Sequence, residues 1–146
     1  MRKMIILLAG AAFLLTGCFN PASVSVVEDM YEEALLEDEA AVAAYFNKEF
    51  LREYPVEELA DELATQVRNV EGIKLLNAIE LTGKRLNPEI AAELDDTYEE
   101  RWHYIVNDAG EGDIMTWIVL KTSTHYEITD GKKVTADYYN KHIKNE

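Results

Sequence analysis

The spacing of apolar residues changes along the chain, and this change restricts the fold more than any other feature. In the first half, apolar residues recur every three or four positions, as along one side of a helix. The first such stripe contains Val24, Val27, Met30, Tyr31, Ala34 and Leu35. Beyond about residue 99, apolar residues instead alternate, as in strands whose successive side chains point to opposite faces. Helices followed by an antiparallel meander predict an α+β domain with helices on one face of a curved sheet.

Capping residues divide the helical half into three expected segments. Asn20 is expected to cap the first helix, with Pro21 at its first position. Asp38 should cap a second helix over residues 39 to about 50. A third helix should open at Pro55 and stop at Gly72.

The second half reads as strands and turns. Strands are expected over residues 73–81, 99–107, 113–122 and 124–128, with a short helix from Asn87-Pro88 to about Leu94, a turn over 108–112 and a tight turn at Asp130-Gly131. The last dozen residues should form a short strand or a frayed tail. Both central strands carry bulky apolar residues on both faces. One face should meet the helices, and the other should meet the curled sheet itself, a ligand or a partner.

An export signal precedes this domain. Arg2 and Lys3 are followed by an apolar run over residues 4–15 and two small residues, which is the pattern of a secretory signal. The run is shorter than the roughly 20 residues that a membrane-spanning helix needs. Leu15-Thr16-Gly17-Cys18 resembles the lipobox of bacterial lipoproteins, and Cys18 is the only cysteine in the chain. The alternatives are an ordinary cleaved signal with a chance cysteine, or an uncleaved membrane helix.

The lipoprotein resemblance implies a diacylglyceryl group on Cys18 and cleavage just before it. Residues 1–17 are then the signal peptide, residues 18–20 the lipidated cysteine and a short tether, and residues 21–146 a single α+β domain. The expected location is the extracytoplasmic face of the cell membrane, because two acyl chains anchor a protein stably.

The charge of the chain excludes one class of partner. The sequence has 14 basic and 28 acidic residues, a net charge of −14. Cleavage would remove Arg2 and Lys3 and no acidic residue, which leaves −16. Nucleic acid is therefore not an expected partner, because its binding depends on Lys and Arg at phosphates. A membrane-proximal protein or a small ligand remains open.

Few residues suggest catalysis. The three histidines lack metal-ligand spacing, so neither a metal nor a cofactor is predicted. The acidic, glycine-containing segment 108–113 suits a hairpin turn better than a calcium loop. Candidate ligand-binding residues are Trp102, Tyr104, His103 and Trp117, with core packing as the alternative role of the aromatic rings.

The segment from Pro21 to Phe50, PASVSVVEDMYEEALLEDEAAVAAYFNKEF, resembles the first helices of small NTF2-like bacterial lipoproteins. The likeness has no diagnostic motif, and Asn87-Pro88 interrupts the strand order that the family would show. A cystatin-like sheet wrapped on one helix is the rival. The NTF2-like resemblance implies a pocket between sheet and helices, in which some members place a catalytic Asp or His. The candidates that this resemblance implies here are His103, His125, Asp95 and Asp96. We expect a lipid-anchored binding domain, with a pocket enzyme of isomerase or dehydratase type, or an accessory or inhibitory subunit, as alternatives.

Overall fold

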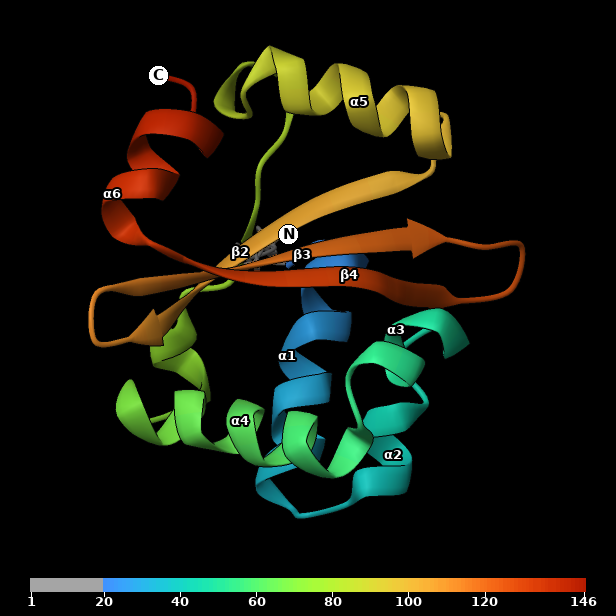
Figure 1. The fold of residues 1–146 in the computed structure, drawn as a ribbon, viewed down its shortest axis with the longest axis vertical. Coiled ribbons are helices and arrows are strands. Elements are labelled where there is room, and N and C mark those ends of the chain that lie inside the picture. The colour runs from blue at the N-terminus through green and yellow to red at the C-terminus, as the bar shows by residue number, and fades with distance from the viewer. Residues whose placement is uncertain (1–19) are drawn as a thin grey trace, which may run out of the picture.

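A computed structural model describes residues 20–146, which form three layers (Figure 1). A four-stranded antiparallel sheet with strand order β1-β2-β3-β4 lies in the middle. Four helices cover one face, and α5 with the C-terminal helices covers the other. The α+β class expected from the sequence is therefore confirmed, with a second helical layer in addition. The signal segment and Cys18 lie outside the described residues.

The first helical layer consists of α1 (Ala22–Leu35), α2 (Glu39–Ala43), α3 (Lys48–Glu53) and α4 (Val56–Asn69). Pro21, not Asn20, is the N-cap residue of α1. The Asn20 side chain instead donates a hydrogen bond to Glu28 Oε1 at 2.5 Å. Asp38 caps α2 as expected, since its Oδ1 accepts from the Ala41 N–H at 3.0 Å.

The single helix expected over residues 39 to about 50 is wrong, because the backbone between α2 and α3 pairs with the sheet. Ile128 N donates to Tyr45 O at 2.8 Å, and Asn47 N donates to Ile128 O at 3.0 Å. A continuous helix would need Tyr45 O and Asn47 N for its own backbone hydrogen bonds. Because both bond to Ile128 instead, the helix is interrupted here. Asn47 then caps α3, with its side chain accepting from Phe50 N at 2.8 Å.

The strand expected over residues 73–81 is mostly wrong. Residues Ile73–Leu76 form the 3-10 helix η1, and only Ile79–Glu80 form the strand β1. Asn77 lies between them with a left-handed φ of 49°, which strand geometry does not allow. After the short turn η2 (Gly83–Arg85), α5 (Pro88–Tyr98) begins at the expected Asn87-Pro88 cap and continues beyond Leu94.

Three long strands form most of the sheet: β2 (Trp102–Gly110), β3 (Asp113–Lys121) and β4 (Tyr126–Thr135). Only Glu111 and Gly112 separate β2 from β3, both with positive φ, as a tight hairpin turn requires. The tight turn expected at Asp130-Gly131 is wrong, because both residues lie inside β4. Gly131 pairs with Trp117, and a Cβ on it would lie 2.3 Å from Trp117 Cζ3. This glycine makes room for the indole ring rather than for a turn.

The two faces of the sheet carry separate cores. Between the sheet and the first helical layer lie Trp117, Tyr31, Met30 and Leu63, all fully buried. The second core lies on the opposite face and contains Leu81, Leu86, Leu94, Tyr104, Val106, Val134 and Ile143.

The C-terminal segment completes the second core, contrary to the expected strand or frayed tail. It forms α6 (Ala136–Tyr138) and the π-helix η3 (Tyr139–Ile143). Asn87 N donates to Ile143 O at 2.8 Å, and Asn145 N donates to Arg85 O at 2.9 Å. Helix α5 and this segment together cover the second face of the sheet.

Candidate functional site

The structure places the candidate aromatic residues on opposite faces of the sheet. Trp102 and Tyr104 face α5 and the C-terminal helices, whereas Trp117 faces α1 and α4. Trp117 is fully buried and Tyr104 is buried, so both pack in the cores. The three rings therefore do not form one common surface.

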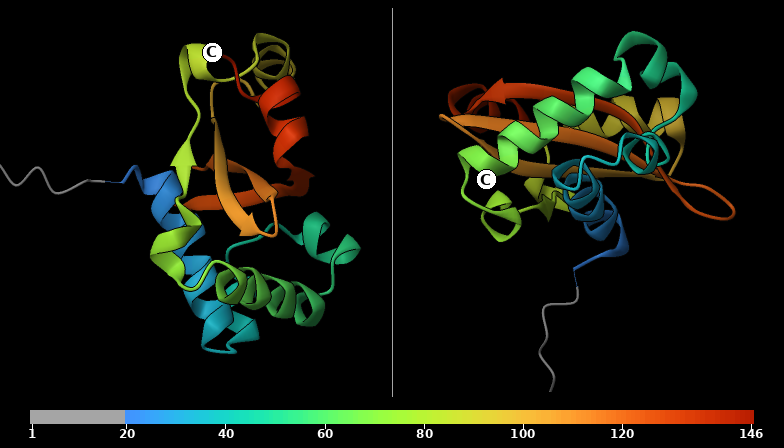
Figure 2. Two further views of the ribbon diagram at one scale, coloured as in Figure 1. Left: turned by 90° about the vertical axis from the view of Figure 1, so that its left-hand side faces the viewer. Right: turned by 90° about the horizontal axis from the view of Figure 1, so that it is seen from below.

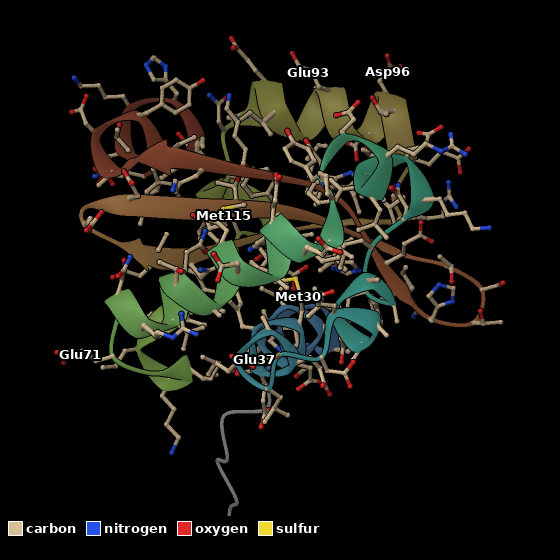
Figure 3. The ribbon with its side chains drawn as sticks, turned by 60° about the horizontal axis from the view of Figure 1, so that its bottom comes forward. Met30, Glu37, Glu71, Glu93, Asp96 and Met115 are labelled. Atoms are coloured by element: carbon tan, nitrogen blue, oxygen red, sulfur yellow. The ribbon has the colours of Figure 1, made fainter. Side chains whose placement is uncertain are left out.

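The two aspartates lie on α5, above the second core. Asp95 accepts a hydrogen bond from Trp102 Nε1 at 2.8 Å, and this bond fixes the half-buried indole against the helix. Figure 3 shows Asp96 and Glu93 on the outer side of α5, while Met30 and Met115 lie between the sheet and the first helical layer. Asp95 therefore positions a tryptophan, and Asp96 is exposed.

His103 belongs to a partly buried side-chain cluster that has the composition of an acid-base site. Its Nδ1 is hydrogen-bonded to Glu80 Oε1, and the ring of Tyr126 lies edge-on at 5.8 Å. The His103 side chain is 29% exposed and that of Glu80 is 14% exposed. The three residues come from β2, β1 and β4, and water reaches the imidazole. A carboxylate on Nδ1 fixes the tautomer, which leaves Nε2 to accept or donate a proton.

The other histidines lie elsewhere. The exposed His125 is in the turn between β3 and β4, where its Nδ1 lies 3.1 Å from Thr122 Oγ1 and 2.9 Å from Thr124 Oγ1. It borders an open depression of about 480 Å³ that Phe46, Lys48 and Glu127 also line. The His142 ring lies tilted against the ring of Tyr138 in the C-terminal segment, with the ring centres 4.6 Å apart.

A row of hydrogen bonds crosses the first core. Trp117 Nε1 donates to Asn107 Oδ1 at 2.9 Å, and Asn107 Nδ2 donates to the Tyr31 hydroxyl at 3.0 Å. The Tyr31 hydroxyl then donates to Gln66 Oε1 at 2.6 Å. Burial raises the pKa of Tyr31 well above its usual range, so the hydroxyl remains a neutral donor.

This row reaches the surface through an ion pair. Gln66 Nε2 donates to Glu62 Oε1 at 3.2 Å, and Lys133 Nζ donates to the same oxygen at 2.9 Å. The hydrogen bond from Lys133 lowers the pKa of Glu62, and the same bond raises the pKa of Lys133. The row joins α1, α4 and the three long strands, and its inner members are closed to solvent. The row therefore stabilises the packing of these helices on the sheet and is not suited to catalysis.

Acidic groups gather around a depression of about 280 Å³ between α1, α2 and α4. Glu37, Glu39, Glu57 and Asp61 line it, with Arg68 as the cation. No group of three or more His, Cys, Asp or Glu side chains suited to a metal occurs within residues 20–146. In the same part of the chain, no helix is long and apolar enough to cross a membrane.

Comparisons with family models, with curated proteins and with solved structures found no match to this chain. Its function must therefore be inferred from its own residues.

Sequence reasoning missed Glu80, Tyr31, Asn107 and Gln66 as partners in polar clusters. Two of them carry a usable signal. Gln66 lies beside Val67 in the apolar stripe of α4, and Asn107 follows the inward-facing Ile105 at the next position on the same face of β2. A polar residue at an inward position predicts a buried hydrogen bond. Glu80 has no such signal, because its pairing with His103 depends on the register of β1 against β2.

Proposed function

We propose that this chain is exported, lipidated at Cys18 and held at the extracytoplasmic face of the membrane, where it acts as a binding domain. The observation that carries the proposal is the sequence Leu15-Thr16-Gly17-Cys18, which directly follows an apolar run with a basic start. It ends only two residues before the first described residue, Asn20.

Export and lipidation are tested by replacing the cysteine. In a bacterial host supplied with a labelled fatty acid, wild type should give a labelled band of mature size, and Cys18→Ala should give an unlabelled band of precursor size. Triton X-114 extraction should carry the wild-type mature band into the detergent phase. A mature-size Cys18→Ala band in the detergent phase would disprove the lipid anchor.

The NTF2-like fold belongs to this proposal as well. Helices α1 to α4 lie against one face of an antiparallel meander, as such a fold would place them, and two long helices on that face argue against a cystatin-like sheet on one helix. The layer of α5 and η3 on the other face is a departure. The space in which an NTF2-like pocket would lie is filled by Trp117 and Tyr31, and this favours binding at the surface over catalysis in the interior.

One observation favours an enzyme as the second candidate, namely the His103–Glu80 pair beside Tyr126. A general acid or base contributes typically about 10² to 10⁴ in rate. If the domain only binds, His103→Gln and Glu80→Gln should leave its cellular phenotype intact at matched protein levels, as should Asp95→Ala. A null phenotype from His103→Gln in protein that stays folded would establish the enzyme instead. His142→Gln is the matched control, because His142 is exposed, lies in the C-terminal segment outside this cluster and is not a catalytic candidate.

A further inference from the structure

The folded domain begins beside an exposed apolar segment. Figure 2 shows the start of α1 on the same side of the molecule as η1 and β1. Asn20, the first described residue, lines one depression together with Glu28, Ile73, Lys74 and Ile79. The place where the chain enters the domain and the segment from η1 to β1 are therefore parts of one surface.

This surface exposes large apolar side chains that the two cores do not use. Leu75 is 50% exposed and Ile79 is 39% exposed, although both belong to a class of residue that is usually buried. Lys74 precedes them in η1. Leu75 lines a neighbouring depression with Asp108, Glu111 and Asp113, and Asn77 borders both depressions. Ile79 lies on β1, which is the edge strand of the sheet. Two apolar side chains with an adjacent cation have the composition of a contact with the headgroup region of a bilayer.

The covalent chain limits what this surface can reach. Asn20 follows Cys18 by two residues, and this length of chain spans at most about 7 Å even when fully extended. If Cys18 carries a diacylglyceryl group inserted in the bilayer, Asn20 and the depression that it lines must lie at the level of the headgroups. Helix α1 has 14 residues, so its two ends lie about 21 Å apart along the helix axis. At the far end, the exposed Leu36 has no such constraint.

We propose that the face defined by Lys74, Leu75 and Ile79 rests on the lipid surface that holds the anchor, an inference that depends on the proposed lipidation of Cys18. Leu75 and Ile79 lie among the upper acyl chains and glycerol groups, and Lys74 lies at the lipid phosphates. This contact turns the acidic depression between α1, α2 and α4 away from the bilayer. Lys74 is the cation that this face offers to anionic lipid, and Glu28 is the carboxylate of the same depression.

The test uses the lipidated mature chain, which begins at Cys18, in phosphatidylcholine vesicles with and without phosphatidylglycerol. The sulfur of Cys18 is consumed by the lipid, so Leu75→Cys or Ile79→Cys supplies a unique thiol for an environment-sensitive fluorophore. Leu36→Cys is the matched control, since Leu36 is 69% exposed at the far end of α1. Labels at positions 75 and 79 should shift to shorter emission wavelengths and be quenched by nitroxide lipids. The label at position 36 should resemble the same label in water, and Lys74→Glu should reduce quenching at position 75 in anionic vesicles.

The outcomes separate the two proposals. If the chain fails to cofloat with vesicles and carries no lipid, the anchor is wrong, and the membrane contact falls with it. If the chain is lipidated and cofloats but labels at 75 and 79 respond like the label at 36, the anchor stands and the contact is overturned. A label that is shielded from water but not quenched by nitroxide lipids would show that protein covers this face, which also overturns the proposal.

Discussion

At the scale of single residues, the row Trp117–Asn107–Tyr31–Gln66 gives a partner to each polar side chain that it buries. Each donor in it points the same way, toward the carboxylate of Glu62. Unpaired polar groups in a core are expensive, so the members of the row depend on one another. A buried hydroxyl and two amides therefore fix how α1 and α4 sit on the sheet, which apolar contacts alone would define less sharply.

We expect Tyr31→Phe to lower the free energy of unfolding by about 1 to 3 kcal/mol, because it leaves Gln66 Oε1 buried without a donor. Urea denaturation followed by circular dichroism measures this. The matched control is Tyr54→Phe, which changes an exposed tyrosine and should remain within about 0.5 kcal/mol of wild type. Equal urea midpoints for the two variants would contradict the stabilising role of the row.

Two glutamates should change the pH dependence of stability in opposite directions. The pKa of Glu62 is lowered in the folded chain, first by the hydrogen bond from Lys133. Its contribution to the free energy of unfolding is therefore present above the pKa of the unfolded chain, and it is lost as pH falls through the pKa of the folded chain. The pKa of Glu28 is raised, first by burial and then by Asp29. The contribution of Glu28 to the free energy of unfolding is present below the pKa of the unfolded chain, and it is lost as pH rises through the pKa of the folded chain.

Glu62→Gln should therefore be less stable than wild type at neutral pH and equal to it in acid. The loss should stay below about 1 kcal/mol, because both partners of the ion pair are about half exposed. Glu28→Gln should be more stable than wild type at neutral pH, and the gain should disappear in acid. Thermal unfolding between about pH 3 and 8 decides this, and a common pH trend for both variants would contradict the assignment.

At the scale of elements, β4 illustrates how a tertiary contact overrides a local signal. Asp130-Gly131 has the composition of a tight turn. The strand nevertheless continues through it, and Thr129 forms a bulge where the register shifts between Ile118 and Val119 on β3. The glycine is required because the Trp117 ring lies against its Cα, a contact between residues on different strands.

Gly131→Ala should destabilise the domain by about 1 to 3 kcal/mol, as overpacking does, because the added methyl group meets Trp117 Cζ3. The penalty should shrink in a Trp117→Phe background, which lacks the outer ring of the indole. Gly83→Ala is the control, since a methyl group added there would meet nothing within 4 Å and its cost comes from a φ of +52° alone. That cost should be the same in both backgrounds. An unchanged penalty for Gly131→Ala would refute the contact.

The sequence predicts elements well where the signal is local and poorly where partners are distant. The stripe of α1, the Asp38 and Asn87 caps and the alternation in β2 and β3 all depend on neighbouring residues, and all are found. The break before α3 depends on backbone bonds to Ile128, which is far away along the chain. Of the candidate site, His103 is identifiable by residue type. Its partner Glu80 is not, because β1 is too short to be recognised by alternation.

At the scale of the whole molecule, the sheet is shared by two cores, and each contains one of the two tryptophans. Trp117 reports on the core beneath α1 and α4, and Trp102 reports on the core beneath α5. Residues of β2 and β3 that face one core have neighbours along the strand that face the other. Loss of one core should therefore remove the support of the second.

We expect the two cores to unfold in one transition. In Trp117→Phe, fluorescence comes from Trp102 alone, and in Trp102→Phe it comes from Trp117 alone. In each variant, the fluorescence midpoint in urea should coincide with that from far-ultraviolet circular dichroism, as two-state unfolding requires. Separate midpoints for the layer of α5 in the Trp117→Phe variant would show that this layer melts independently.

The bonds from Ile143 and Asn145 to the segment around Arg85 and Asn87 have a consequence for synthesis. Until residue 145 has left the ribosome, those bonds cannot form, and the face of the sheet with Tyr104, Ile114 and Ile118 lacks part of its cover. A nascent chain stopped before residue 139 would present this apolar surface to the cell. Truncation there should yield a client of chaperones and proteases rather than a smaller working domain, since exposed apolar faces and unfinished sheets are what those systems bind.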